Sequence, residues 1–79
     1  MTESEQTYGE KAVGLSFNPS ADTDVDKIKR LYADVIDLLY AKRQHLGSDR
    51  SEAARLYSIA ITEAQTAQMW AVKAVTWRT

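Results

Sequence analysis

Gly47 is the feature that most constrains the fold, because it separates two long stretches, 22–46 and 50–77, that contain neither glycine nor proline. Glycine often takes the left-handed conformation in which helices end, and each uninterrupted stretch is compatible with one continuous helix. A connection of a few residues makes two such helices antiparallel neighbours. The sequence therefore predicts an all-α fold: one domain over 1–79, in which two long antiparallel helices form an αα-hairpin.

The ends of the predicted helices carry the expected signals. The first helix begins near Asp22, where acidic side chains face the positive end of the helix dipole. Asp49 and Glu52 have the spacing of a capping box at the start of the second helix.

Residues 1–20 are predicted to form an N-terminal arm or short helix and a turn. Thr2 and Glu5 have capping-box spacing, which favours either a short helix or a frayed terminus. Asn18 precedes Pro19, and its backbone is therefore driven out of the helical region. The chain should be extended or turning at this point.

The hairpin is not expected to exist alone. A domain of 79 residues has a small core, and the chain contains no cysteine to reinforce it. Apolar side chains occur on more than one face of both predicted helices, and two helices cannot cover all of these faces. We therefore predict a compact homo-oligomer. The interface candidates are Ile36, Leu39, Tyr40, Met69 and Trp70.

Composition argues against several classes of function. The 10 basic residues are balanced by 11 acidic ones, which is not typical of DNA-binding proteins. No apolar run approaches the roughly 20 residues of a membrane span, and the acidic N-terminus does not resemble a signal peptide. With no cysteine and a single histidine, we expect no metal site, no cofactor and no enzymatic activity. A cytoplasmic location follows.

Two groups of residues are candidates for ligand binding. Lys27, Lys29 and Arg30 either pair with nearby aspartates on a solvated face or form an anion site at the start of the helix. Phe17 either stacks on a flat ligand or pins the arm to the hairpin. On the second helix, polar residues interrupt the apolar faces, and such residues hydrogen-bond between helices more often than they contact a ligand. These residues are Thr62, Gln65, Thr66 and Lys73.

Three segments carry a family resemblance: Phe-Asn-Pro-Ser at 17–20, Val-Asp-Lys-Ile-Lys at 25–29, and the stretch 60–74, which ends in Met-Trp-Ala-Val-Lys-Ala. Together they resemble the phage anti-CBASS cyclic-nucleotide sponges, whose helical hairpin is shared with the anti-Thoeris sponge proteins. The similarity extends from Gly14 to Thr76, and the final segment is its most specific part.

The resemblance implies a function in immune evasion by a bacteriophage. Such proteins sequester cyclic dinucleotides, for example cyclic GMP-AMP, in the host cell cytoplasm without cleaving them, and the host effector is then not activated. A compact homohexamer with nucleotide pockets between protomers is also implied. Two alternatives stay open: a sponge for the cyclic ADP-ribose signals of Thoeris defence, and a helical protein–protein interaction module. Neither the base nor the linkage isomer can be ranked from the sequence.

The resemblance also implies roles for individual residues. An aromatic residue of the arm stacks on a base, which by position is Phe17, and a lysine early in the first long helix contacts the ligand, which is Lys29. The full set of ligand-binding candidates is Phe17, Asn18, Ser20, Lys27, Lys29 and Tyr32.

Some of the resembling proteins bind cyclic trinucleotides at a second site through an arginine, at the position that Ile61 holds in this chain. Whether such a second pocket exists here is therefore open. Its candidates are Thr62, Gln65, Thr66 and Lys73.

Overall fold

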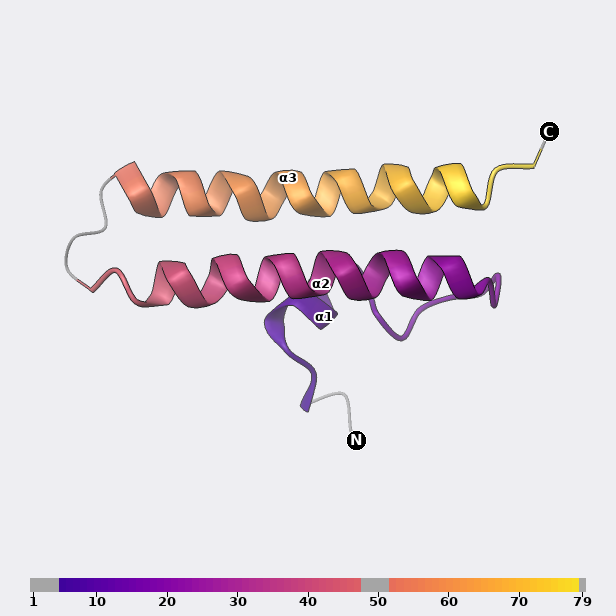
Figure 1. Ribbon diagram of the computed structural model, residues 1–79, viewed down its shortest axis with the longest axis horizontal. Helices are drawn as coiled ribbons and strands as arrows, with labels where there is room; N and C mark the ends of the chain where they lie inside the picture. Colours follow the sequence, from indigo (N-terminus) through magenta and orange to yellow (C-terminus); the bar gives the residue numbers. More distant parts are fainter. Residues whose placement is uncertain (1–4, 48–51, 79) are drawn as a thin grey trace.

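The computed structural model describes residues 5–47 and 52–78. It contains three helices in this part of the chain, α1 (Tyr8–Val13), α2 (Thr23–Gln44) and α3 (Glu52–Val75), and no strand. Figure 1 shows α2 and α3 side by side and antiparallel, with the short α1 against α2. The prediction of an all-helical chain is confirmed. No helix of the described ranges is long and apolar enough to cross a membrane.

The long helices lie close to their predicted ranges. The Asp22 side chain caps α2 by accepting a hydrogen bond from the amide of Asp24 at 2.8 Å. The helix ends at Gln44, two residues before the predicted boundary, and Gly47 follows in the left-handed conformation with φ of 63°. The capping box predicted for the second helix involves Asp49, which lies outside the described residues.

The short helix α1 begins later than the sequence signal suggested. Its capping box is formed by Thr7 and Glu10, in which each side chain accepts a hydrogen bond from the other residue's main-chain amide. The helix ends at Gly14, which has the left-handed conformation. Thr2, the other half of the predicted box, lies outside the described residues. At Gly9 a side chain would clash with the main-chain oxygen of Ala33, so α1 approaches α2 closely.

The core lies where the three helices meet. Val13 of α1, Ala33 and Ile36 of α2, and Ile61 of α3 are buried together. Tyr40, which packs against this cluster, also stacks on Tyr8 with ring centroids 4.3 Å apart. The second apolar face of α2 is thus covered partly by α1 of the same chain.

This packing corrects one interface assignment. Ile36 has no exposed surface in the single chain, so it contributes to the core and offers nothing to a second copy. Leu39 and Tyr40 are half-buried and pack against the same core, which leaves part of each side chain accessible.

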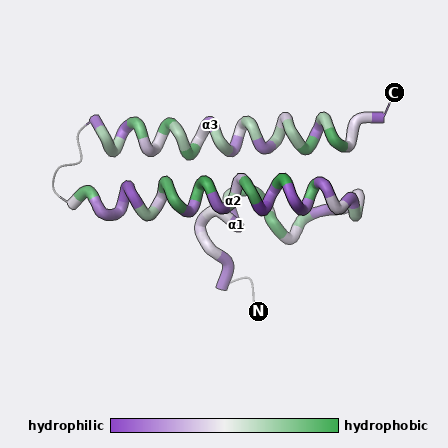
Figure 2. Tube along the Cα trace, in the orientation of Figure 1, coloured by the Kyte–Doolittle hydropathy of each residue, from purple (hydrophilic) through white to green (hydrophobic). Residues whose placement is uncertain are grey.

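The chain is nevertheless only one layer thick. Its Cα atoms span 48 × 31 × 13 Å, and Figure 2 shows hydrophobic positions distributed along both long helices. A single layer cannot enclose the apolar side chains on both of its sides. The large hydrophobic residues that stay exposed on α2 and α3 are Leu31, Val35, Leu38, Leu56, Ile59, Met69 and Trp70.

Candidate functional site

Lys29 is a buried cation held under the turn that precedes α2. The residue is only 5% exposed. The ammonium donates hydrogen bonds to the main-chain carbonyl oxygens of Gly14, at 3.0 Å, and of Phe17. It also lies 5.5 Å from the centroid of the Phe17 ring, within the range of a cation–π contact. The turn is therefore folded around a positive charge.

The charge of Lys29 is not balanced by a carboxylate among the described residues. Its two cationic neighbours on α2 are paired: Lys27 lies 3.9 Å from Asp24, and Arg30 donates to both Glu10 and Asp34. Lys29 has neutral carbonyl partners only. Because burial of a charge without a counterion is unfavourable, an anion that reached this ammonium would gain a strong interaction.

A hollow of about 220 Å³ lies beside Lys29, between the turn, the start of α2 and the end of α3. Four of the ligand-binding candidates, Phe17, Asn18, Ser20 and Lys29, line it together with Val72 of α3 and Thr76, which follows that helix. The Phe17 side chain is exposed, at 70% of its full surface. The hollow thus brings a cation and an accessible aromatic ring to one place.

Asn18 and Ser20 use their polar groups to build the turn. The Asn18 amide nitrogen donates to the Asp22 carbonyl and to the Asp26 carboxylate, each at 2.9 Å, and its oxygen accepts from the Ser20 hydroxyl at 2.8 Å. These bonds join the turn to the first residues of α2. Both side chains line the hollow, and this network fixes the backbone that carries Phe17.

The remaining two ligand-binding candidates lie elsewhere. Lys27 is exposed and borders a different depression, which it shares with Arg30, Leu15 and Leu31. Tyr32 is half-buried and packs against the core. The structure therefore does not bring Lys27 or Tyr32 to the hollow at Lys29.

A second, larger hollow of about 700 Å³ lies between α1 and α3, and Phe17 borders this one as well. Three candidates for a second pocket, Thr62, Gln65 and Thr66, line it. The fourth, Lys73, is exposed on α3 and lies 5.8 Å from the Trp70 ring centroid instead. Ile61 is buried in the core.

Two residues that border the second hollow were missed by the sequence analysis. Lys11 reaches it from α1, and no periodic signal marks that short helix. Gln68 reaches it from α3 and is only 6% exposed. A signal existed for Gln68, because it lies seven residues after the apolar Ile61 and therefore on the same face of the helix.

Arg30 and Glu10 tie α1 to α2 next to the site. Their closest atoms are 2.6 Å apart, and the Glu10 carboxylate also accepts from the Thr7 amide at 2.9 Å. The hydrogen bond from Arg30 and then that from Thr7 lower the pKa of Glu10 below its ordinary value of 4.5. This pair neutralises Arg30 and makes it unsuitable as the free cation of the site.

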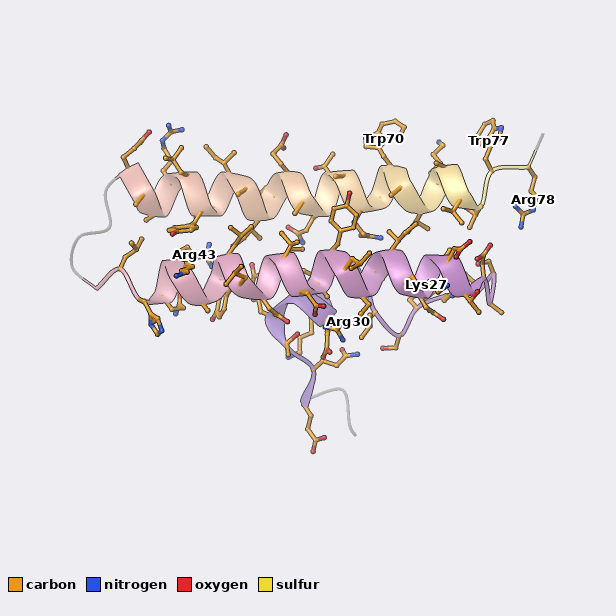
Figure 3. All side chains as sticks on the ribbon, in the orientation of Figure 1. Lys27, Arg30, Arg43, Trp70, Trp77 and Arg78 are labelled. Atoms are coloured by element: carbon orange, nitrogen blue, oxygen red, sulfur yellow. The ribbon has the colours of Figure 1, made fainter. Side chains whose placement is uncertain are left out.

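The exposed tryptophans lie on the opposite side of α3 from α2. Figure 3 shows Trp70 and Trp77 pointing away from α2, whereas Arg43 lies between the two long helices. Trp70 is 66% exposed in the single chain, and its neighbour Met69 is exposed to a similar degree. In the described ranges, no group of three or more His, Cys, Asp or Glu side chains is placed to hold a metal ion.

Comparison with known proteins gives one match. The family model described as "Acb2/Tad1, hairpin domain" matches residues 10–76, which include α2, α3 and most of α1. Neither the curated proteins nor the solved structures provide a match. The chain therefore belongs to the Acb2/Tad1 hairpin-domain family, the phage sponges that bind cyclic nucleotide signals.

Proposed function

We propose that this protein binds and sequesters the cyclic dinucleotides of CBASS defence, cyclic GMP-AMP among them, and thereby keeps them from the host effector. The observation that carries the proposal is the pairing of Lys29 with Phe17 at the edge of one hollow. A cyclic dinucleotide has anionic phosphates and flat bases. A buried cation without a carboxylate partner can bind the phosphates, and an exposed aromatic ring can stack on a base.

The proposed site is completed by a second copy of the chain. The hollow at Lys29 holds about 220 Å³, below the roughly 300–1,000 Å³ of sites that enclose a small molecule. Phe17 stands at its rim with most of its ring uncovered. A partner chain that covered the exposed apolar residues of α2 and α3 would also enclose the hollow on the side of Phe17. The thin shape of the chain supports such an assembly, and the number six comes from the resemblance alone.

The proposed action is binding without cleavage, within the host cell cytoplasm where the signals are made. The groups at Lys29 that could touch the ligand are an ammonium, a phenyl ring, an amide and hydroxyls. These groups hold a phosphate and stack on a base, and the hydroxyls of Ser20 and Thr76 donate to an amide and a carbonyl oxygen and not to a general base. Sequestration depends on affinity and on the concentration of the protein.

The test is calorimetric titration of the protein with cyclic GMP-AMP, cyclic di-AMP, cyclic di-GMP and cyclic ADP-ribose. Binding of the cyclic dinucleotides, abolished or strongly weakened in a Lys29→Met Phe17→Ala double variant, is the expected result. Binding of cyclic ADP-ribose alone would assign the chain to Thoeris signals. If no nucleotide binds, the hairpin acts as an interaction module and the proposal is wrong.

A further inference from the structure

Gln68 is a buried amide on α3 that has no hydrogen-bond partner among the described residues. The residue is only 6% exposed, the most buried uncharged polar side chain of the core region. None of the side-chain hydrogen bonds between described residues involves its amide. Buried amides in proteins are normally bonded, so an amide without a protein partner is normally open to water or to a ligand.

The amide of Gln68 is accessible from the second hollow. In the described part of the chain, no side-chain nitrogen or oxygen is both fully enclosed and without a hydrogen bond. Since the Gln68 amide makes no such bond, its atoms keep some contact with solvent, and the hollow that the residue lines provides it. Most of the residue is buried, and the small part that stays exposed includes the amide.

Phe17 connects this hollow to the site at Lys29, because it borders both. Because Phe17 and Gln68 border the same hollow, a flat ring stacked on that side of Phe17 would occupy the space that Gln68 also borders. The hollow is large enough for such a ring, since about 700 Å³ lies within the range of small-molecule sites, roughly 300–1,000 Å³.

We propose that Gln68 recognises the edge of the base that stacks on Phe17, and that it selects adenine. The inference rests on the proposed function. A glutamine amide presents one donor beside one acceptor, which matches the adjacent acceptor and donor of adenine at N7 and N6. The corresponding edge of guanine presents two acceptors, N7 and O6, and satisfies only the amide nitrogen. Cyclic dinucleotides that contain adenine are therefore the preferred ligands.

The experiment compares cyclic di-AMP with cyclic di-GMP, by calorimetry, in the full-length protein and in Gln68→Leu. Leucine has a similar size and suits a buried position, so the variant should melt at the parent's temperature or above it. Gln68→Met, which keeps an unbranched side chain, is a second test variant at this position. Gln44→Leu, the same change at an exposed position of α2, is the matched control.

The parent is expected to bind cyclic di-AMP roughly tenfold more tightly than cyclic di-GMP, as for a bidentate base contact. In both Gln68 variants the affinities for the two nucleotides should become similar, mainly because the binding of cyclic di-AMP becomes weaker. Gln44→Leu should keep the parent's preference. If the preference survives in the Gln68 variants, or if the parent favours cyclic di-GMP, Gln68 does not read adenine although the sponge function stands. Failure of the parent to bind either nucleotide overturns the sponge function together with this inference.

Discussion

The ammonium of Lys29 donates a hydrogen bond to the main-chain carbonyl of Phe17, so the charged residue of the site also holds the backbone of its aromatic residue. The same ammonium bonds the Gly14 carbonyl, and the two contacts fix the turn on both sides. A phosphate that approached Lys29 would meet the ammonium in the place where the turn positions the ring. Charge and stacking surface are thus coupled through one side chain.

This coupling predicts that Lys29→Met weakens both folding and binding. The variant leaves two carbonyl oxygens without their donor, which costs about 1–3 kcal/mol of stability for each group that stays buried and unpaired. Affinity for a cyclic dinucleotide should fall by more than tenfold, since the phosphate loses its cation. Thermal melts without ligand and calorimetry with cyclic GMP-AMP measure the two effects.

Lys27→Met is the matched control, because Lys27 is exposed and its one ion pair within residues 5–47 and 52–78 is with Asp24. It should resemble the parent in both measurements. A Lys29→Met protein that melts and binds as the parent does would show that this ammonium is neither a structural clamp nor a ligand contact.

Phe17 is predicted to act in stacking and to contribute little to the stability of the free protein. Phe17 is 70% exposed, so Phe17→Ala removes few core contacts and should change the melting temperature only slightly. Affinity should fall by about 1–3 kcal/mol, the value for one stacked base. Phe17→Tyr should bind as the parent does, and Phe17→Leu should not. A large loss of stability in Phe17→Ala that leucine restores would identify a hydrophobic pin instead.

Glu10 should make the stability of the protein depend on pH. Arg30 and the Thr7 amide lower the pKa of Glu10 in the folded state below 4.5, and the unfolded chain keeps a pKa near that value. The unfolded state therefore binds the proton more readily. The stabilising contribution is present above pH 4.5 and is lost as the pH falls through the lower, folded-state pKa.

Thermal melts between pH 7 and pH 3 test this dependence. The parent should lose more stability on acidification than Glu10→Gln, which cannot ionise, whereas Glu63→Gln at an exposed position of α3 should follow the parent. Equal losses in the parent and in Glu10→Gln would show that the contact with Arg30 has no net effect on folding.

The sequence predicted the long helices well because their signals are local. The cap at Asp22 and the glycine at position 47 act within a few residues of themselves. In the structure Asp22 is the N-cap, and Gly47 is left-handed but lies two residues beyond His45, the C-cap of α2. The role of Ile36 could not be predicted, since the helix that covers it comes from a distant part of the chain. Thr7 and Glu10 also have capping-box spacing, but only the Thr2 and Glu5 pair was considered from the sequence.

For the candidate site, the sequence analysis named several residues that the structure brings together, but not how they are held. Phe17 and Lys29 do share a hollow, but the burial of Lys29 depends on a turn 12 to 15 residues earlier, which no periodic pattern encodes. From its neighbours in sequence, Lys29 looks like a member of a solvated basic cluster. Gln68 was missed because a glutamine on a helix is usually solvated, although its place on the same helix face as Ile61 did indicate burial.

Trp70 is predicted to act in assembly. Because it is 66% exposed in the single chain, Trp70→Ser should leave the helical content of the chain nearly unchanged and should lower the apparent mass in sedimentation equilibrium. Trp70→Tyr, which keeps an aromatic ring, should assemble more fully than the serine variant. A parent protein that sediments as the 8.9 kDa monomer at micromolar concentration would contradict the oligomer.

The central claim is that the protein stores its ligand unchanged, and recovery of that ligand tests it most directly. The protein is saturated with cyclic GMP-AMP, freed of unbound nucleotide by gel filtration and denatured by heat, and the released nucleotide is analysed by mass spectrometry. We predict that intact cyclic GMP-AMP is recovered in the amount that was bound, and that it again activates the effector. A linear product, or a protein that retains no nucleotide through the filtration, would contradict the claim.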